Sequence, residues 1–94
     1  MKENIILSNI KNNINFIKNF KVKKIGIFGS AVNGTLKNNN NVDILVEFDE
    51  PTFDNFMNLL DYLEGLLNRK IDLITNYGLN KYMKSAIENE VVWI

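Results

Sequence analysis

The fold of this chain is decided by IGIFGS at residues 25–30, followed by NVDILVEF at residues 41–48. In the first stretch an apolar strand runs into a Gly-Ser turn, and in the second an otherwise apolar strand carries Asp43. KIDLIT at residues 70–75 repeats the second pattern with Asp72. An ionised carboxylate in a core-like strand is unfavourable by several kcal/mol unless it is paired, hydrated or bound to a metal. The two aspartates and the Gly-Ser turn therefore point to a metal and nucleotide site.

Apolar periodicity outside these stretches predicts helices that alternate with strands. Apolar residues spaced by three and four predict an amphipathic helix over residues 3–19, within an N-terminal segment of residues 1–20. Another helix follows Pro51, with Thr52 or Asp54 as its cap and Phe53 on its buried face. This alternation predicts an α/β fold, with helices packed on a mixed or parallel sheet. The predicted strands span residues 24–28, 42–48, 70–75 and 91–94, and the other helices span residues 30–33 and 80–89.

The composition predicts a single domain over residues 1–94 that works with oxygen ligands. Hydrophobic residues make up 46% and charged residues 23% of the chain, and the formal net charge is zero. This balance argues against direct nucleic-acid binding, because neutralising phosphates needs a basic surface. The chain has no cysteine and no histidine, so disulfides, thiolate sites and the commonest zinc ligand are excluded. The remaining oxygen ligands favour Mg²⁺ or Mn²⁺.

The hydropathy pattern predicts a protein with no membrane partner. No apolar run approaches the roughly 18 residues that a membrane span needs. The first residues, MKEN, carry mixed charge and lack the apolar core of a secretory signal. We therefore expect a cytoplasmic location.

Gly29 and Ser30 are the candidate phosphate-binding residues. A glycine lets backbone N–H groups approach a ligand closely, and the hydroxyl of Ser30 would reach a phosphate at the start of the following helix. In open α/β sheets, ligands bind beyond the carboxyl ends of the strands, and that edge would include both residues. The alternative is an ordinary strand-to-helix turn, because Gly-Ser pairs are common in turns.

Asp43 and Asp72 are the candidate metal ligands. Strand residues two apart share a face, so a carboxylate at position 41 would project beside Asp43 and grip the same divalent ion. Position 41 is Asn41 instead. If their strands are neighbours, Asp43 and Asp72 can face one metal. The alternatives are a solvated strand end for Asp43, and an ion pair with Arg69 or Lys70 for Asp72.

The combined spacing of these motifs resembles the minimal nucleotidyltransferases of the DNA polymerase beta superfamily. The resemblance rests on Gly29-Ser30, Gly34, residues 42–48 and residues 69–74. It runs from about residue 24 to residue 94, which it implies is the nucleotidyltransferase core with a small mixed β-sheet. The small size resembles that of MntA-type antitoxins, which are paired with HEPN-type RNase toxins in toxin–antitoxin modules.

The resemblance also implies a chemistry. Members of this family use two Mg²⁺ ions, ATP and three aspartates to transfer AMP to an acceptor hydroxyl. In the toxin-paired members, the acceptor is a tyrosine of the HEPN-type toxin, which adenylylation silences. Carried onto this chain, the resemblance implies that Gly29 and Ser30 hold the triphosphate and that Asp43 ligates metal. It implies that Asp72 is the third carboxylate, which binds metal and helps to deprotonate the acceptor.

Two positions depart from the family pattern. The first metal-binding aspartate falls on Asn41, which keeps one oxygen but loses the charge that holds a hard cation. Asn33 stands where many members carry arginine. Three explanations of Asn41 stay open: an engineered Asp→Asn change, a natural enzyme that has lost catalysis and kept binding, or slow turnover with Mg²⁺ held by Asp43, Asp72 and the triphosphate.

Two hypotheses about function follow. In the first, the chain is an antitoxin-type adenylyltransferase, dependent on ATP and Mg²⁺, whose activity is impaired by Asn41. In the second, it is a catalytically inactive binding module that neutralises its partner by complex formation. A third hypothesis, for which the sequence offers less support, is an enzyme that adds a nucleotide to a small molecule.

Overall fold

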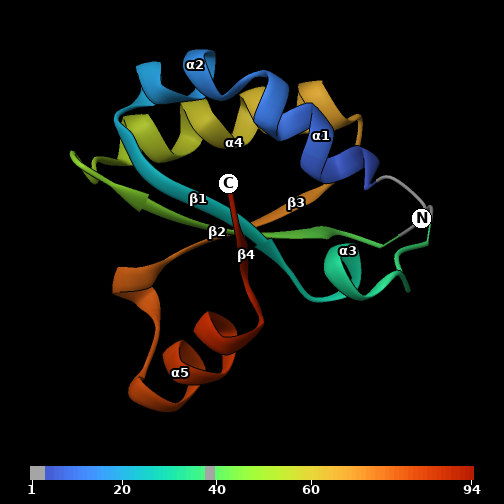
Figure 1. The fold of residues 1–94 in the computed structure, drawn as a ribbon. Helices are drawn as coiled ribbons and strands as arrows, with labels where there is room; N and C mark the ends of the chain where they lie inside the picture. Colours follow the sequence, from blue (N-terminus) through green and yellow to red (C-terminus); the bar gives the residue numbers. More distant parts are fainter. Residues whose placement is uncertain (1–3, 38–39) are drawn as a thin grey trace.

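The fold is a four-stranded mixed sheet with helices on both of its sides. The computed structural model describes residues 4–37 and 40–94. The strands lie in the order β3-β2-β1-β4 (Figure 1). The elements are α1 (Ile5–Asn12), α2 (Ile14–Ile17), η1 (Lys18–Phe20), β1 (Val22–Phe28), α3 (Ser30–Asn33), β2 (Val42–Phe48), α4 (Phe53–Leu67), β3 (Ile71–Thr75), η2 (Asn76–Gly78), α5 (Lys81–Glu90) and β4 (Val92–Trp93).

The sheet combines both kinds of strand pairing. β1 pairs antiparallel with β2 and with β4, whereas β2 and β3 run parallel. A parallel pair needs a crossover between its strands, and α4 supplies it. The α/β fold with a mixed sheet is therefore confirmed.

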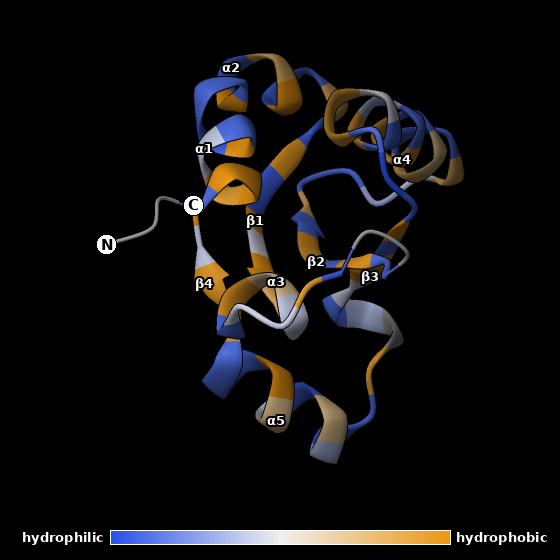
Figure 2. Cartoon of the chain, turned by 90° about the vertical axis from the view of Figure 1, so that its right-hand side faces the viewer, coloured by the Kyte–Doolittle hydropathy of each residue, from blue (hydrophilic) through white to orange (hydrophobic). Residues whose placement is uncertain are grey.

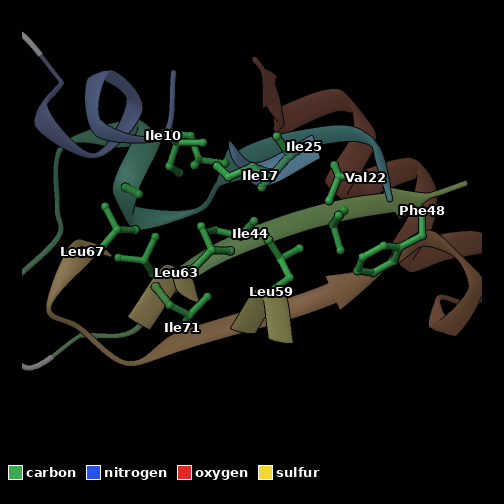
Figure 3. Close-up of a cluster of buried hydrophobic side chains, with 14 residues drawn as sticks. Ile10, Ile17, Val22, Ile25, Ile44, Phe48, Leu59, Leu63, Leu67 and Ile71 are labelled. Atoms are coloured by element: carbon green, nitrogen blue, oxygen red, sulfur yellow. The ribbon is translucent and has the colours of Figure 1, made fainter. Parts of the chain in front are cut away.

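The hydrophobic core lies between the sheet and the layer formed by α1, α2 and α4. Both views place these helices on one side of the sheet and α5 on the other (Figure 1 and Figure 2). Alternate residues of β2 point into this core, as the period of two predicts. Leu59, Leu63 and Leu67 of α4, spaced by four, close it from the helix side (Figure 3). The most deeply buried members are Ile10, Ile17, Ile25, Ile27, Val42, Ile44, Val46, Leu59 and Leu63.

Two details of the predicted helices are wrong. The N-terminal helix is interrupted at Asn13, where the backbone leaves helical geometry and the side-chain amide donates to the carbonyl of Asn9 at 2.8 Å. Asparagine competes in this way with the helical ladder of hydrogen bonds, so α1 and α2 are separate. Phe53, expected on the buried face of α4, is 76% exposed because it lies in the first turn, at the open end of the helix.

The remaining boundaries lie close to the predictions. Thr52 is the cap of α4, since its side chain accepts a hydrogen bond from the Asn55 N–H at 3.1 Å. β1 begins earlier than expected, because Val22 pairs with Phe48 and joins the core. Across residues 4–37 and 40–94, no helix combines the length and the apolar character needed to cross a membrane.

Candidate functional site

The Gly-Ser turn between β1 and α3 depends on the absence of a side chain at Gly29. The backbone of Gly29 has φ 67° and ψ −140°, a conformation that is strained for any other residue. A Cβ atom at this position would lie 2.5 Å from Oδ2 of Asp43. The turn therefore holds its backbone directly against the Asp43 carboxylate. Gly34, with φ 80°, ends α3 as the sequence predicts.

Asp43 and Asp72 lie side by side on the sheet. The parallel register of β2 and β3 pairs them directly, and on the other side of Asp43 the antiparallel register pairs it with Phe28. Both aspartates point away from the α1–α2–α4 layer, since their neighbours Val42, Ile44 and Ile71 fill the core. The condition for a shared metal, that the two strands are neighbours, is met.

The electrostatics of this pair favour a cation. Burial raises the pKa of Asp43 above its ordinary value of 3.8, since the side chain is half-buried. The negative charge of Asp72 raises this pKa further, as does a side-chain hydrogen bond with Asp72. The charge of Glu90, at the end of α5, adds a smaller contribution in the same direction. A bound cation would remove the cost of keeping Asp43 ionised here.

Asn41 binds one of the two aspartates. Its side-chain amide nitrogen donates a hydrogen bond to Oδ1 of Asp72 at 3.1 Å. Position 41 therefore contacts position 72, which the strand register pairs with position 43. The amide of Asn41 supplies a partial positive charge where a carboxylate would supply a negative one. It neutralises part of the local charge without a metal.

Arg69 has a different role from the one considered in the sequence. Its guanidinium donates to the carbonyl of Lys37 at 2.8 Å and to that of Asn40 at 3.3 Å, rather than to Asp72. Arg69 thereby ties the polar loop before Asn41 to the beginning of β3. Sequence reasoning missed this role because a side chain that binds distant backbone carbonyls leaves no periodic signal.

The site lies where the carboxyl end of one strand meets the amino ends of two others. Gly29 and Ser30 follow the carboxyl end of β1, as predicted. Asp43 and Asp72, however, lie near the amino ends of β2 and β3. The two sets meet because β1 runs antiparallel to β2. A ligand here would contact one carboxyl end and two amino ends of strands.

The donor set fits one hard cation better than two. Two adjacent carboxylates and an amide oxygen are ligand types that Mg²⁺ accepts, and phosphate oxygens of a nucleotide would complete the coordination. Among the described residues, no group of three or more acidic, histidine or cysteine side chains is arranged to hold a metal. The family pattern described above expects a third carboxylate at position 41, where this chain has Asn41.

Comparison with known proteins agrees with this geometry. Residues 7–94 match a family model described as the nucleotidyltransferase domain. The chain is 41% identical over 76 residues to the protein adenylyltransferase MntA of Thermococcus cleftensis, a match that covers 80% of this chain and 77% of that protein. It is 40% identical over 79 residues to a Methanocaldococcus jannaschii protein assigned as a protein adenylyltransferase, covering 80% and 79% of the two chains.

Solved structures share the fold at lower sequence identity. One assigned to the minimal nucleotidyltransferases has a TM-score of 0.85 at 22% identity and covers 98% of this chain and 95% of its own. The complex of a tri-AMPylated Shewanella oneidensis HEPN toxin with its MNT antitoxin gives a TM-score of 0.68 at 16% identity, over 95% and 71% of the chains. The family match over residues 7–94 and the identity to the adenylyltransferase relatives show that this chain is a member of the nucleotidyltransferase domain family.

Proposed function

We propose that this chain is the antitoxin-type adenylyltransferase of a toxin–antitoxin module, with activity lowered by Asn41. Its substrate would be ATP, and its acceptor a tyrosine hydroxyl of a HEPN-type toxin partner. The observation that supports this most is the pairing of Asp43 with Asp72 against the Gly29 turn. The relatives named as protein adenylyltransferases, and a fold shared with antitoxins in complex with HEPN toxins, support the choice of acceptor.

Gly29 and Ser30 would bind the triphosphate. The Gly29 backbone lies close to Asp43, so phosphates bound at the turn would lie beside a metal-binding carboxylate. Ser30 begins α3 and is half-buried, so its hydroxyl is available at the mouth of the turn. A backbone and hydroxyl cradle of this kind suits phosphate oxygens.

Asp43 and Asp72 would hold Mg²⁺, with Asn41 as a weak, neutral third ligand. When bound, divalent ions in such sites neutralise the charge that develops on the attacking and leaving oxygens of a phosphoryl group. The family pattern implies two ions, but the side chains present favour one. Loss of the carboxylate at position 41 should weaken the second ion most, since a hard cation depends on ligand charge.

The chemical step would be an in-line displacement at the α-phosphorus of ATP. A bond forms between the tyrosine oxygen and the α-phosphorus, and the bond from that phosphorus to the β-phosphate oxygen breaks. Pyrophosphate leaves, and the tyrosine proton passes to the Asp72 carboxylate. One oxygen of Asp72 already accepts the amide hydrogen of Asn41. This leaves Asp72 fewer lone pairs for the acceptor, which is a second reason to expect slow transfer.

Intact-mass spectrometry tests the proposal directly. The protein encoded beside this one, as the proposed HEPN-type partner, would be incubated with Mg-ATP and either the native chain or its Asn41→Asp variant. We expect an AMP-sized gain in mass with the variant, and a slower gain or none with the native chain. Asp72→Asn added to the variant is the matched control and should abolish transfer. An Asn41→Asp chain that transfers no AMP would contradict the enzyme proposal.

A second function is favoured by Asn41 itself. Because its amide already satisfies Asp72 without a metal, the site is electrostatically closer to balance than three carboxylates would be. This suits a binding module that neutralises its partner by complex formation alone. This function would be supported if the native chain co-elutes with the partner and neither the native chain nor its Asn41→Asp variant transfers AMP.

A further inference from the structure

A second surface, remote from the aspartates, has the features of a binding groove. It is a hollow of about 470 Å³ between the N-terminal helices α1 and α2 on one side and β1 and the C-terminal residues on the other. Figure 2 shows these helices beside β1, with the C-terminus on the same side of the molecule. We call this hollow the lysine groove, because Lys11, Lys18, Lys23 and Lys24 line it.

The charge of the lysine groove is concentrated and mostly uncompensated. Four of the chain's 11 basic residues lie here, although the chain as a whole has no net charge. Lys23 lies 3.8 Å from Glu47 in an exposed ion pair, which is weak. Lys24 lies over the ring of Trp93, 4.3 Å from its centroid. Lys11 and Lys18 are exposed, and within residues 4–37 and 40–94 neither has an acidic partner.

The floor of the lysine groove is apolar and largely aliphatic. Leu7 and Ile14 contribute from the helices, Ile25 from β1, and Ile94 and Trp93 from the C-terminal end. Trp93 is 37% exposed, and one face of its ring is covered by Lys24. Aliphatic side chains match the side chains of a protein segment. They offer little to nucleic-acid bases, which bind by stacking on open aromatic rings.

We propose that the lysine groove docks an acidic segment with aliphatic side chains, contributed by the protein partner. This inference rests on the proposed function, which supplies that partner. The match is one of chemistry: carboxylates of the segment would meet the lysine rim, and its aliphatic side chains would cover the floor. Charged rims of this kind steer association and select partners.

The lysine groove is separate from the catalytic aspartates. Val22 lines it and Gly29 contacts Asp43, and β1 runs between the two positions. Four to seven strand residues separate Gly29 from Ile25 and Val22 of the groove, a span of about 13–23 Å. A partner bound in the groove would therefore reach the site with a different part of its surface. Docking would raise the local concentration of the acceptor tyrosine without taking part in the chemistry.

Calorimetric titration of the native chain with the purified HEPN-type partner tests this docking. The groove variant is Lys11→Glu/Lys18→Glu, and the control is Lys37→Glu/Lys84→Glu, which makes the same charge change elsewhere. We expect the groove variant to bind at least about tenfold more weakly, with the control within about twofold of native. Binding by the native chain should weaken as salt rises, and binding by the groove variant should respond less. Circular dichroism would check that each variant is folded, and Lys11→Gln/Lys18→Gln replaces the groove variant if it is not.

A kinetic measurement separates docking from chemistry. In the Asn41→Asp background, the groove substitutions should raise KM for the partner at least about fivefold and leave kcat unchanged. A fall in kcat with unchanged KM would overturn the inference.

The remaining outcomes distinguish the two proposals. A groove variant that binds the partner as tightly as native would overturn the docking inference and leave the proposed function standing. A native chain that does not bind the partner would overturn both. A groove variant that keeps the partner but loses binding of a single-stranded RNA oligonucleotide would assign the groove to nucleic acid, and so overturn the inference.

Discussion

Replacing Asn41 by aspartate should make the metal-free protein less stable and should increase its affinity for a divalent metal. In the native chain, the Asn41 amide donates to Asp72 at 3.1 Å. The substitution removes that hydrogen bond, worth about 1 kcal/mol, and adds a third carboxylate. Two unit charges about 4 Å apart repel by about 4 kcal/mol at an effective dielectric constant of about 20. Because both side chains are exposed, screening leaves about 1 kcal/mol of this repulsion.

The expected result is therefore a loss of about 2 kcal/mol in the free energy of unfolding in EDTA. For a chain of this size, that corresponds to a fall in Tm of at least about 8 °C. Mg²⁺ at about 100 times its Kd would raise the free energy of unfolding of the variant by about 2.7 kcal/mol. Mg²⁺ should bind the variant at least about tenfold more tightly than it binds the native chain, because removing a group that supports a metal typically costs about 10–100-fold in affinity.

Thermal unfolding with EDTA and with Mg²⁺ is the assay. Asn58→Asp, an exposed position on α4, is the control for adding a negative charge away from the site. Asn41→Ala separates the lost hydrogen bond from the added charge. If Asn41→Asp unfolds at the native temperature in EDTA and its Tm does not respond to Mg²⁺, the carboxylates are not electrostatically coupled as the geometry indicates.

Three further predictions concern single residues of the site. Gly29→Ala should lower the free energy of unfolding, measured in urea, by at least about 2 kcal/mol, because Gly29 has a φ of 67° and its Cβ would collide with Asp43. The control Gly65→Ala, on an open face of α4, should raise the free energy of unfolding by about 0.5–1 kcal/mol. Equal effects of the two substitutions would refute the steric argument. In EDTA, Asp43→Asn should have a higher free energy of unfolding than native at pH 7, because the raised pKa of Asp43 means that its ionisation destabilises the folded state. This gain in stability should vanish as pH falls through the raised pKa to below 3.8. A gain that does not depend on pH would exclude ionisation of Asp43 as its cause. Arg69→Ala should speed amide hydrogen exchange at the beginning of β2 and lower the free energy of unfolding by about 1–2 kcal/mol, because two backbone carbonyls lose their hydrogen bonds. The neighbouring control Lys70→Ala should change neither quantity. Unchanged exchange in Arg69→Ala would show that the loop does not depend on these two hydrogen bonds.

Much of the fold could be predicted because its signals are local. The alternation of buried and outward residues along β2, and the caps at Thr52 and Gly34, depend on residues within a few positions of each other. The errors arose where a local side-chain interaction interrupted a predicted helix, or where a predicted buried residue lay at the open end of a helix. Asn13 interrupts the N-terminal helix through its own side chain, and Phe53, in the first turn of α4, stays largely exposed.

The candidate site could be predicted in membership but not in arrangement. Asp43 and Asp72 could be picked out because an ionised carboxylate in an apolar strand is unfavourable unless it is paired, hydrated or bound to a metal. Their pairing depends on the parallel register of β2 and β3, which α4 and the core impose. The roles of Arg69 and Glu90 depend on contacts across the chain, so no pattern in the sequence indicated them.

By itself, the sequence determined which side chains this protein can use: carboxylates, an amide and a Gly-Ser turn, with no histidine or cysteine. It also determined the order of strands and helices, because hydrophobic periodicity is a local property. Only the tertiary structure decided that the turn after β1 meets the amino ends of β2 and β3, and that the Asn41 amide binds Asp72. The physical reason is that strand direction and register are chosen by packing of the whole core, in which residues far apart in the chain must fit together at once.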